Sequence, residues 1–400
     1  MSDIEKPIPL CVDLDGTLIR TDLLTESFVR VLKAQPWLLF MMPLWLMKGK
    51  HHLKSQLALR SQIDIERLPY AGEFIDWLRE QKAAGRELHL VTGSNVRLAR
   101  LIAKELDLFE DIIASDDDRN VIGASKADVL IKRFGEKAFD YAGNEKVDLH
   151  IWRHARYAIP VNAFASTIDE AKKVAELEAV FERPPFKKKA LIKAMRLHQW
   201  MKNSLIFVPL FTAHEVFNPS AWLFAIIGFI AFGLCASATY IVNDLSDLDA
   251  DRAHHTKCKR PFASGELTIL FGMILATVLL IVSSILLLFL PWQFALVLLC
   301  YVVGTLTYTF RLKSVAMVDV IVLASLFTIR VIAGAAAIGV TLSFWLMAFS
   351  VFVFLSLAIV KRVSELMNLR TKKKIEAKGR GYYVHDIQIL KSLGGSSGYM

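Results

Sequence analysis

Four aspartates, Asp244, Asp247, Asp249 and Asp251, follow the apolar run that ends at Asn243. On a helix, three of them share one face with Asn243, while Asp249 points away from that face. Carboxylates crowded on one face repel each other unless cations bind between them, and carboxylate oxygens are ligands that Mg²⁺ prefers. The spacing therefore favours a site for magnesium and a diphosphate over a simply solvated loop.

The loop after these acids is basic, with Arg252, Lys257, Lys259 and Arg260. Such side chains suit phosphate binding. Lys and Arg also accumulate in loops that stay on the cytoplasmic side of a membrane. Two interpretations stay open for these residues, a clamp on the diphosphate and a signal for topology.

A second group of polar residues lies in the N-terminal half. Asp13 and Asp15 end a strand-like run, "PLCVDLDGTL", and residues two apart on a strand face the same side. Thr92 ends a second expected strand, Lys126 begins an expected helix, and residues 144–148 follow another strand. Because open α/β sheets bind ligands at the carboxyl ends of their strands, we expect these groups to converge there on a phosphate.

The elements that must hold these residues are of two kinds. The chain has 400 residues, of which 54% are hydrophobic, and a mean hydropathy of +0.40, which is too apolar for an average soluble protein. Residues 1–200 carry charges throughout, whereas residues 204–361 contain apolar runs long enough to cross a hydrocarbon core about 30 Å thick. The predicted spans are 197–214, 219–243, 267–290, 292–310, 316–338 and 342–361.

Basic loops alternate with loops that contain neither Lys nor Arg. By the positive-inside rule, the basic loops lie in the cytoplasm, together with the N-terminal half, which has no signal peptide. We therefore expect a multi-pass protein of the inner cell membrane. Its net charge of +9 then reflects topology and contact with anionic membrane lipids rather than nucleic acid. The cysteines show no CxxC spacing, which argues against a metal knuckle or a disulfide framework.

The order DxDGT at Asp13–Thr17, then Thr92, then Lys126 resembles the haloacid dehalogenase superfamily of phosphohydrolases over about residues 8–165. The resemblance implies an α/β domain with a Rossmann-like sheet. It also implies that Asp13 attacks phosphorus to give an aspartyl-phosphate and that Asp15 is the general acid and base. Thr92 and Lys126 would hold the transferring phosphoryl group.

Magnesium, by the same resemblance, is held by Asp13, the backbone carbonyl of Asp15 and an acid of the final motif. The family usually has an aspartate directly after a glycine, where this chain has Asn144. Either Asp148 or Glu145 completes the magnesium site, or binding is weakened. Both an active phosphatase and a domain that kept the fold but lost turnover therefore stay open.

Residues 20–85 are expected to form a helical cap on this domain. Within it, residues 37–47 are apolar but are broken by Pro43, so they cannot span a bilayer. One interpretation is a buried pair of helices. The other is a surface that rests on the membrane, with Trp37 and Trp45 at the interface.

The pattern NDxxDxxxD at the end of a membrane helix resembles the UbiA-type intramembrane prenyltransferase superfamily, and the resemblance covers residues 190–400. Members form an all-α transmembrane bundle whose site opens toward the cytoplasm. The resemblance implies that Asn243, Asp244, Asp247 and Asp251 bind magnesium and the diphosphate. The chain ends within a seventh apolar stretch, so we expect a truncated bundle.

Further segments resemble one branch of that superfamily, the polyprenyl-phosphate phosphoribosyltransferases: "RLHQWMKN", "YTFRLK", "TIRVIAGA" and "AIVKRVSEL". Members transfer 5-phosphoribose from 5-phosphoribosyl diphosphate to a polyprenyl phosphate, in the pathway to the lipid-linked arabinose of cell walls. The resemblance implies that Lys202, Arg311 and Lys313 bind the remaining phosphates. Further substrate-binding candidates are Gln199, Asn203, Tyr308, Lys257 and Arg260.

The loop after the fourth span bears on the donor. Aromatic prenyltransferases have a second aspartate pair there, whereas this loop offers Arg311, Lys313 and one acid, Asp319. Two bases and one acid suit a phosphate better than a second magnesium. Transfer of an isoprenoid from its diphosphate, and a non-catalytic membrane anchor for the phosphatase, remain as alternatives.

These observations divide the chain into a hydrolase domain at 1–165, a linker at 166–190 and a transferase domain at 191–400. Their adjacency suggests that the soluble half removes a phosphate from the lipid-linked product. One charged residue, Arg330, lies within an apolar span, where an ionisable group is usually functional or paired.

Overall fold

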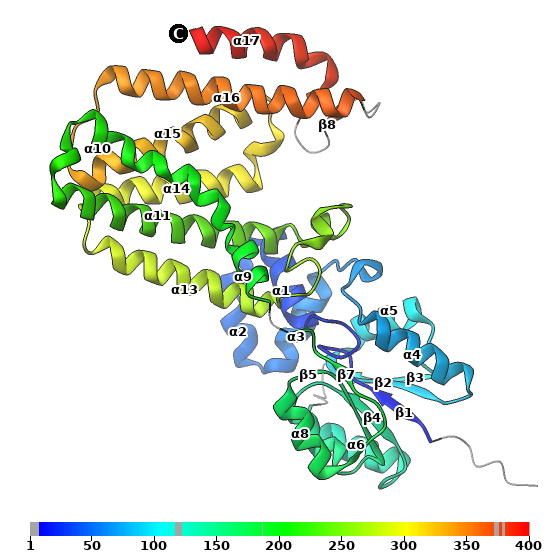
Figure 1. The fold of residues 1–400 in the computed structure, drawn as a ribbon. Helices are drawn as coiled ribbons and strands as arrows, with labels where there is room; N and C mark the ends of the chain where they lie inside the picture. Colours follow the sequence, from blue (N-terminus) through cyan, green and yellow to red (C-terminus); the bar gives the residue numbers. More distant parts are fainter. Residues whose placement is uncertain (1–7, 117–121, 186, 372–375, 378–380, 400) are drawn as a thin grey trace, which may run out of the picture. The chain divides into compact units, whose positions relative to one another are not determined.

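The computed structural model describes residues 8–116, 122–185, 187–371, 376–377 and 381–399 (Figure 1). The chain divides into two compact units. The first contains Met1–Leu191 together with Asp244–Gly272, and the second contains Ile192–Asn243 and Met273–Met400. The acidic segment and the basic loop after it therefore belong to the same unit as the N-terminal domain.

The first unit is built on a parallel sheet. Its described strands are β1 (Leu10–Val12), β2 (Leu88–Asn95), β3 (Asp111–Ser115), β4 (Asp140–Gly143), β5 (Tyr157–Ala163), β6 (Glu176–Leu177) and β7 (Phe181–Glu182). They lie in the order β3-β2-β1-β4-β5-β6, and β7 also pairs with β5. β1 is thus central, between β2 and β4.

Helices cover both faces of this sheet. The alternation of β1 sends Leu10 and Val12 into one core and Cys11 into the other. The first core includes α4 (Gly72–Ala83) and α5 (Val96–Leu106). The second includes α6 (Ala124–Phe134), α7 (Leu149–Trp152) and α8 (Ala165–Val174). The α/β prediction is confirmed, because strands that are apolar on both faces need a helical layer on each side.

A helical insertion separates β1 from α4. It consists of α1 (Leu23–Ala34), η1 (Pro36–Phe40), α2 (Met42–Met47), α3 (Lys50–Arg60) and η2 (Ile65–Arg67). Asp22 caps α1, accepting hydrogen bonds from the backbone N–H groups of Leu24 and Thr25. The buried side chains of α4 belong to the sheet core, so the insertion is shorter than the cap expected at 20–85.

The interpretation of residues 37–47 as buried helices describes one side of this stretch, and Trp45, which the other interpretation put at a membrane interface, is buried. Leu38, Met42 and Trp45 are buried in a small core with α1 and α3. On the outer side of the same short helices, Phe40 is 80% exposed and Met47 is 84% exposed. The stretch is therefore a packed helix pair whose outer face is apolar.

The segment Asp244–Gly272 completes the first unit. It contains the end of α11 (Pro219–Ser246), then α12 (Leu248–Arg252), η6 (Lys257–Lys259) and the start of α13 (Ile269–Leu287). Gly265 has a positive φ of 73°, and a Cβ built there would lie 3.0 Å from the side chains of Arg20 and Pro69. Glycine therefore lets this segment approach the N-terminal domain closely.

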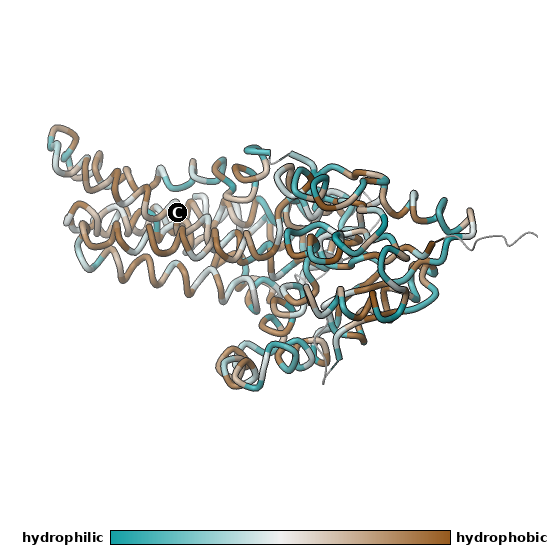
Figure 2. Tube along the Cα trace, turned by 90° about the horizontal axis from the view of Figure 1, so that it is seen from below, coloured by the Kyte–Doolittle hydropathy of each residue, from teal (hydrophilic) through white to brown (hydrophobic). Residues whose placement is uncertain are grey.

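The second unit is a helical bundle. Besides most of α11 and α13, it contains α14 (Trp292–Phe310), α15 (Val318–Ile338), α16 (Phe344–Thr371) and α17 (Ile387–Tyr399). In Figure 1, α14, α15 and α16 run side by side, and the long helices are predominantly apolar in Figure 2. In the described part of the chain, five helices are long and apolar enough to cross a membrane: α11, α13, α14, α15 and α16.

The predicted first span, 197–214, is wrong. This stretch folds into two short pieces, η4 (Leu197–Phe207) and α10 (Val208–Thr212), and η5 (Glu215–Phe217) follows directly after it. Arg196 and His214 at its ends have positive φ, which interrupts a regular helix. Instead of crossing alone, η4 packs into the bundle, since a Cβ on Gly334 would lie 2.0 Å from the Ile206 carbonyl oxygen.

Candidate active sites

The carboxyl end of β1 carries Asp13, which meets Lys126 from α6. Lys126 Nζ donates to Asp13 Oδ1 at 2.7 Å and to the Tyr141 hydroxyl at 3.0 Å. Lys126 is 5% exposed. Burial alone would lower the pKa of Lys126, but the negative charges of Asp13 and Asp148 raise it above its usual range. The lysine is therefore a permanent cation beside the predicted nucleophile.

Asp15 is held by groups from two neighbouring elements. Its Oδ1 accepts from the backbone N–H of Leu23 at 2.8 Å, and its Oδ2 accepts from Ser94 Oγ at 2.5 Å. Thr92 Oγ1 also donates to Oδ2, at a longer 3.4 Å. Burial, with added repulsion from Asp22, raises the pKa of Asp15 to about 7. The predicted group of Asp13, Asp15, Thr92 and Lys126 thus converges at one edge of the sheet.

The final motif closes the other side of this group. Thr17 Oγ1 donates to Asn144 Oδ1 at 3.2 Å, which places the Asn144 amide against the loop after β1. Asp148 Oδ2 accepts from the backbone N–H groups of Asn144 and Glu145, each at 2.9 Å, and its Oδ1 accepts from Tyr141 at 3.2 Å. Asp148 therefore holds the loop that carries Asn144 and Glu145, and a magnesium ligand from among these residues stays a prediction.

The oxygen donors at this edge fit a hard divalent cation. Burial, with repulsion from Asp13 and Asp22, raises the pKa of Glu145. Within the described ranges, no three His, Cys, Asp or Glu side chains are close enough to hold a metal by themselves. The Asn144 amide adds a neutral oxygen at the same edge, where it accepts from Thr17 Oγ1.

A cavity of about 590 Å³ opens beside Asp15. Its lining includes Arg20, Thr21 and Asn144 of the N-terminal domain and several residues between Ser264 and Leu270, which follow the basic loop. Arg20 Nε and Thr21 Oγ1 are buried without a hydrogen-bond partner in the described structure. Phe164, Pro184, Pro185 and Leu270 give the cavity apolar surface as well. The cavity therefore has both polar and apolar walls.

Sequence reasoning missed three residues of this site. Ser94 lies two positions after Thr92, so the period of a strand could have placed it on the same face. Tyr141 precedes Gly143 on β4 by the same spacing. Lys54 comes from α3 and donates to the Gly93 carbonyl at 2.7 Å, a contact that no local pattern indicates.

The acidic segment is not one continuous helix. α11 ends at Ser246, and Asp247 is the N-cap of α12, with φ −101° and ψ 16°. The prediction that Asp244, Asp247 and Asp251 share the face of a single helix is therefore wrong in its geometry. Asp247 also has a partner outside the segment, because Lys33 Nζ of α1 lies 3.3 Å from Asp247 Oδ1.

Asp244 and Asp251 are nevertheless brought together. Arg260 Nη1 lies 3.0 Å from Asp244 Oδ1 and 2.6 Å from Asp251 Oδ2. Both carboxylates are almost completely buried. One positive charge already bridges them, which is the arrangement that a divalent cation would need. In the preceding residue, Asn243, the side-chain oxygen is buried and has no hydrogen-bond partner in the described structure.

Asp249 has a different partner from this pair, Arg30 of α1. It accepts hydrogen bonds from Arg30 Nε at 3.1 Å and from Arg30 Nη2. Arg252, which was a candidate phosphate ligand, donates instead to Glu26 at 2.6 Å and to the Ala263 carbonyl at 3.2 Å. Lys257 is exposed in η6.

In the second unit, the polar residues of the first predicted span lie among the helices. Asn203 is 1% exposed, and its Oδ1 accepts from Arg330 Nε at 3.0 Å. Arg330 also packs against the rings of Tyr301 and Phe327, and Lys202 lies 5.6 Å from the Phe327 ring centroid. The membrane-embedded Arg330 is thus paired between helices. Gln199 is half-buried in η4.

The loop after α14 presents Arg311 at the end of that helix and Lys313 in η7 (Leu312–Ser314), with Tyr308 one turn earlier. The one acid of this region, Asp319, is fully buried and pairs with Arg362 and the hydroxyl of Tyr382. Asp319 therefore links α15 to α16 through its pair with Arg362. Its carboxylate is poorly placed to bind a second magnesium.

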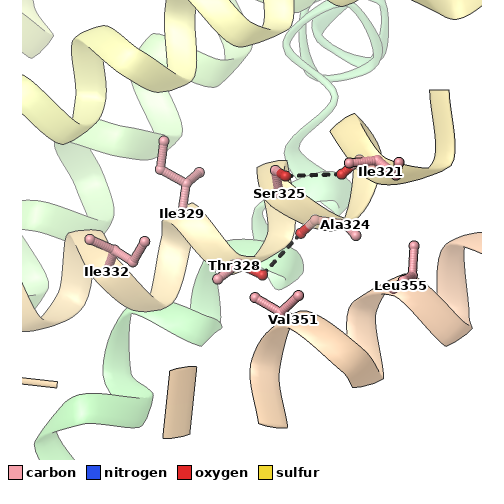
Figure 3. A pocket seen from close by; sticks show the side chains of 8 residues that line it. All are labelled: Ile321, Ala324, Ser325, Thr328, Ile329, Ile332, Val351 and Leu355. Carbon is pink, nitrogen blue, oxygen red and sulfur yellow. Dashed lines mark hydrogen bonds between the residues drawn. The ribbon is translucent and has the colours of Figure 1, made fainter. Parts of the chain in front are cut away.

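A second cavity, of about 280 Å³, lies between α15 and α16 (Figure 3). Ser325 and Thr328 line it, but their hydroxyls donate to carbonyls of their own helix, those of Ile321 and Ala324. The remaining lining residues are aliphatic. The residues that line this cavity provide apolar surface and no ionisable group, so the cavity lacks the side chains that catalysis would need.

Comparisons with known proteins match both units. A sequence model of the UbiA prenyltransferase family matches residues 204–378, and one of haloacid dehalogenase-like hydrolases matches residues 10–151. The uncharacterized protein y4nM of Sinorhizobium fredii is 39% identical over 96% of this chain and 74% of its own length.

Two further relatives match about half of the chain. The nodulation protein NoeC of Azorhizobium caulinodans is 34% identical over 52% of this chain and 67% of its own length. A decaprenyl-phosphate phosphoribosyltransferase of Mycolicibacterium smegmatis is 35% identical over 48% of this chain and 62% of its own length. The matched segment thus spans less than two thirds of that enzyme.

Proposed function

Because this chain belongs to the UbiA prenyltransferase family and carries a haloacid dehalogenase-like hydrolase domain, we propose that it transfers 5-phosphoribose from 5-phosphoribosyl diphosphate to a polyprenyl phosphate. The observation that carries the proposal is the buried pair of Asp244 and Asp251, bridged by the cationic Arg260. Similarity to a decaprenyl-phosphate phosphoribosyltransferase supports the choice of donor and acceptor.

The residues have distinct tasks in this transfer. Asp244, Asp247 and Asp251 would hold magnesium together with the donor's diphosphate, and the metal would supply positive charge to stabilise the leaving group. Lys202, Arg311 and Lys313 bind the other phosphates. An oxygen of the acceptor phosphate attacks the anomeric carbon as the bond from that carbon to the diphosphate breaks, and the bonding electron pair leaves with the diphosphate. Positioning and charge neutralisation suffice, so no covalent enzyme intermediate is required.

Asp319 supports this donor over an isoprenoid diphosphate, since the one acid near the loop after α14 is occupied by Arg362 and Tyr382. A membrane assay separates the alternatives. Membranes containing the full chain are incubated with magnesium, a polyprenyl phosphate and either radiolabelled 5-phosphoribosyl diphosphate or a radiolabelled prenyl diphosphate. We expect label in the lipid fraction only from the first donor.

The Asp247→Ala variant should lower this incorporation by at least about 100-fold, because the ligand to the metal diphosphate is lost. Equal incorporation by the variant would contradict the assignment of the acidic segment. Incorporation from the prenyl diphosphate alone would replace the proposal by prenyl transfer, and incorporation from neither donor would favour a non-catalytic bundle.

The N-terminal domain is proposed to hydrolyse a phosphate monoester, with the lipid-linked 5-phosphoribose product as substrate. The contact of Asp13 with Lys126 and the cavity beside Asp15 support this reaction. Asp13 attacks phosphorus while the bond to the alcohol oxygen breaks, and Asp15 gives that oxygen a proton. Water then attacks the aspartyl-phosphate, Asp15 takes its proton, and phosphate leaves.

A further inference from the structure

An ion-pair network joins helix α1 to the acidic segment inside the first compact unit. Arg252 Nη2 lies 2.6 Å from Glu26 Oε1, and Arg30 Nε donates to Asp249 Oδ2 at 3.1 Å. Arg30 also pairs with Glu26 one turn earlier on the same helix. Two acids and two bases therefore form one connected, electrically neutral group.

Most of this network is buried. The side chain of Glu26 is fully buried, and those of Arg252 and Arg30 are 4% and 9% exposed, whereas that of Asp249 is 45% exposed. Two buried charges that attract each other at hydrogen-bond distance fix the relative position of their backbones, since moving them apart would leave a charge buried without a partner. A surface ion pair would give little such restraint.

The contacts fall on both sides of Asp251. Asp249 precedes it by two positions and Arg252 follows it directly, while the N-cap of the same short helix, Asp247, lies 3.3 Å from Lys33 of α1. α12 has only five residues, too few to hold its own place as an isolated helix. Its position must therefore come from its packing, and α1 supplies charged contacts along its length.

We propose that Glu26 and Arg30, in the hydrolase-like domain, are positioning residues of the diphosphate site in the transferase family segment. They hold α12 where Asp247 and Asp251 can bind a metal diphosphate together. The inference rests on the proposed function of these aspartates. The fusion of the two domains would then have a structural role, because the hydrolase-like domain helps to position the diphosphate site of the transferase segment.

Calorimetric titration of the full-length chain in detergent with inorganic diphosphate and Mg²⁺ tests this proposal without depending on the donor's sugar. The Asp249→Asn variant keeps the Arg30–Glu26 pair and changes a half-exposed carboxylate, so we expect an unchanged unfolding temperature. We expect its affinity for magnesium diphosphate to fall roughly 10-fold, the usual cost of losing a group that orients a ligand to a metal. Asp249→Glu, which keeps the carboxylate, should restore most of the affinity.

Glu26→Gln should weaken binding at least as much as Asp249→Asn. The matched control is Asp76→Asn, which breaks the exposed pair with Arg79 in the same domain and should bind like the parent. The proposal is overturned if Asp249→Asn and Glu26→Gln bind within a factor of two of the parent while Asp247→Ala does not bind. If Asp247→Ala itself binds like the parent, the assignment of the aspartates fails first, and the positioning role fails with it.

Discussion

At the scale of single residues, the predicted phosphate-binding group of the first unit is assembled from distant parts of the chain. Asp13, Asp15, Thr92 and Lys126 lie more than 100 residues apart at the extremes, yet the parallel sheet brings them to one edge. The surprises are residues whose partners come from distant elements. Asn203 is held by Arg330, and Arg252 by Glu26, so two candidate phosphate ligands have structural partners instead.

We predict that protonation of His89 lowers the stability of the α/β unit at acid pH. It is 5% exposed on β2, lies against Phe134, and neither ring nitrogen has a hydrogen-bond partner in the described structure. Burial, with repulsion from Arg133, lowers the pKa of His89 below its usual 6.5, although Glu87 at 3.8 Å and Asp111 oppose this effect. The unfolded chain then binds a proton more readily than the folded chain, so acidification below about pH 6.5 costs stability.

Thermal unfolding of the full chain in detergent checks this prediction at pH 7.5 and pH 5.5. In the His89→Phe variant the side chain at position 89 cannot be protonated. Its unfolding temperature should therefore fall less on acidification than that of the parent. The exposed His150 provides the control, since His150→Phe should behave like the parent. An equal loss in the parent and in His89→Phe would contradict the prediction.

At the scale of elements, the short helices are the part of the fold that the sequence predicted least well. The break between α11 and α12 at Asp247 is local, and nothing in the apolar pattern before it indicates where the long helix ends. The stretch 197–214 was expected to span a membrane because it is apolar. Its positive-φ ends and its close packing at Gly334 give it another role, as a set of short helices within the bundle.

We predict that the helical insertion of the first unit contacts the membrane through the outer face of η1 and α2. Their outer face exposes Trp37, Phe40 and Met47, and basic residues Lys48 and Lys50 follow directly. An apolar face with aromatic and basic flanks suits the interface of a membrane with anionic lipids. We expect a nitroxide label at Met47→Cys, in proteoliposomes of a chain with Cys258→Ser and Cys300→Ser, to be more accessible to oxygen than to a polar nickel complex.

A label at Arg79→Cys, exposed on α4, should show the opposite preference. The same nickel accessibility at both positions would refute contact with lipid. Spin–spin coupling between Met47→Cys labels would instead indicate that this face is covered by a second copy of the chain.

At the scale of the whole molecule, one chain combines a hydrolase-like domain with a membrane bundle, and residues 244–272 of the transferase family match belong to the compact unit of the hydrolase. That segment contains the acidic residues at its start and part of the lining of the cavity beside Asp15 at its end. The alternating basic loops further support our proposal that both sites face the cytoplasm.

The whole-molecule prediction concerns the products of the two proposed reactions. With 5-phosphoribosyl diphosphate, a polyprenyl phosphate and magnesium, the parent chain should accumulate lipid-linked ribose without its 5-phosphate. Asp13→Asn removes the proposed nucleophile and should shift the product to the phosphorylated lipid while total transfer is retained, as chromatography of the labelled lipids would show. An unchanged ratio of the two lipids would rule out this role of the N-terminal domain.

The sequence by itself determined the two-part architecture, the α/β class of the first part and the identity of most chemical groups. It could do so because apolar periodicity and motif spacing act over a few residues. Only the tertiary structure decided which charges meet. Arg260 bridges Asp244 and Asp251, and Glu26 pairs with Arg252 across 226 residues of chain. Such pairs depend on how elements pack. Burial makes an unpaired charge costly, so the packing that brings opposite charges together is favoured, and no local pattern encodes this.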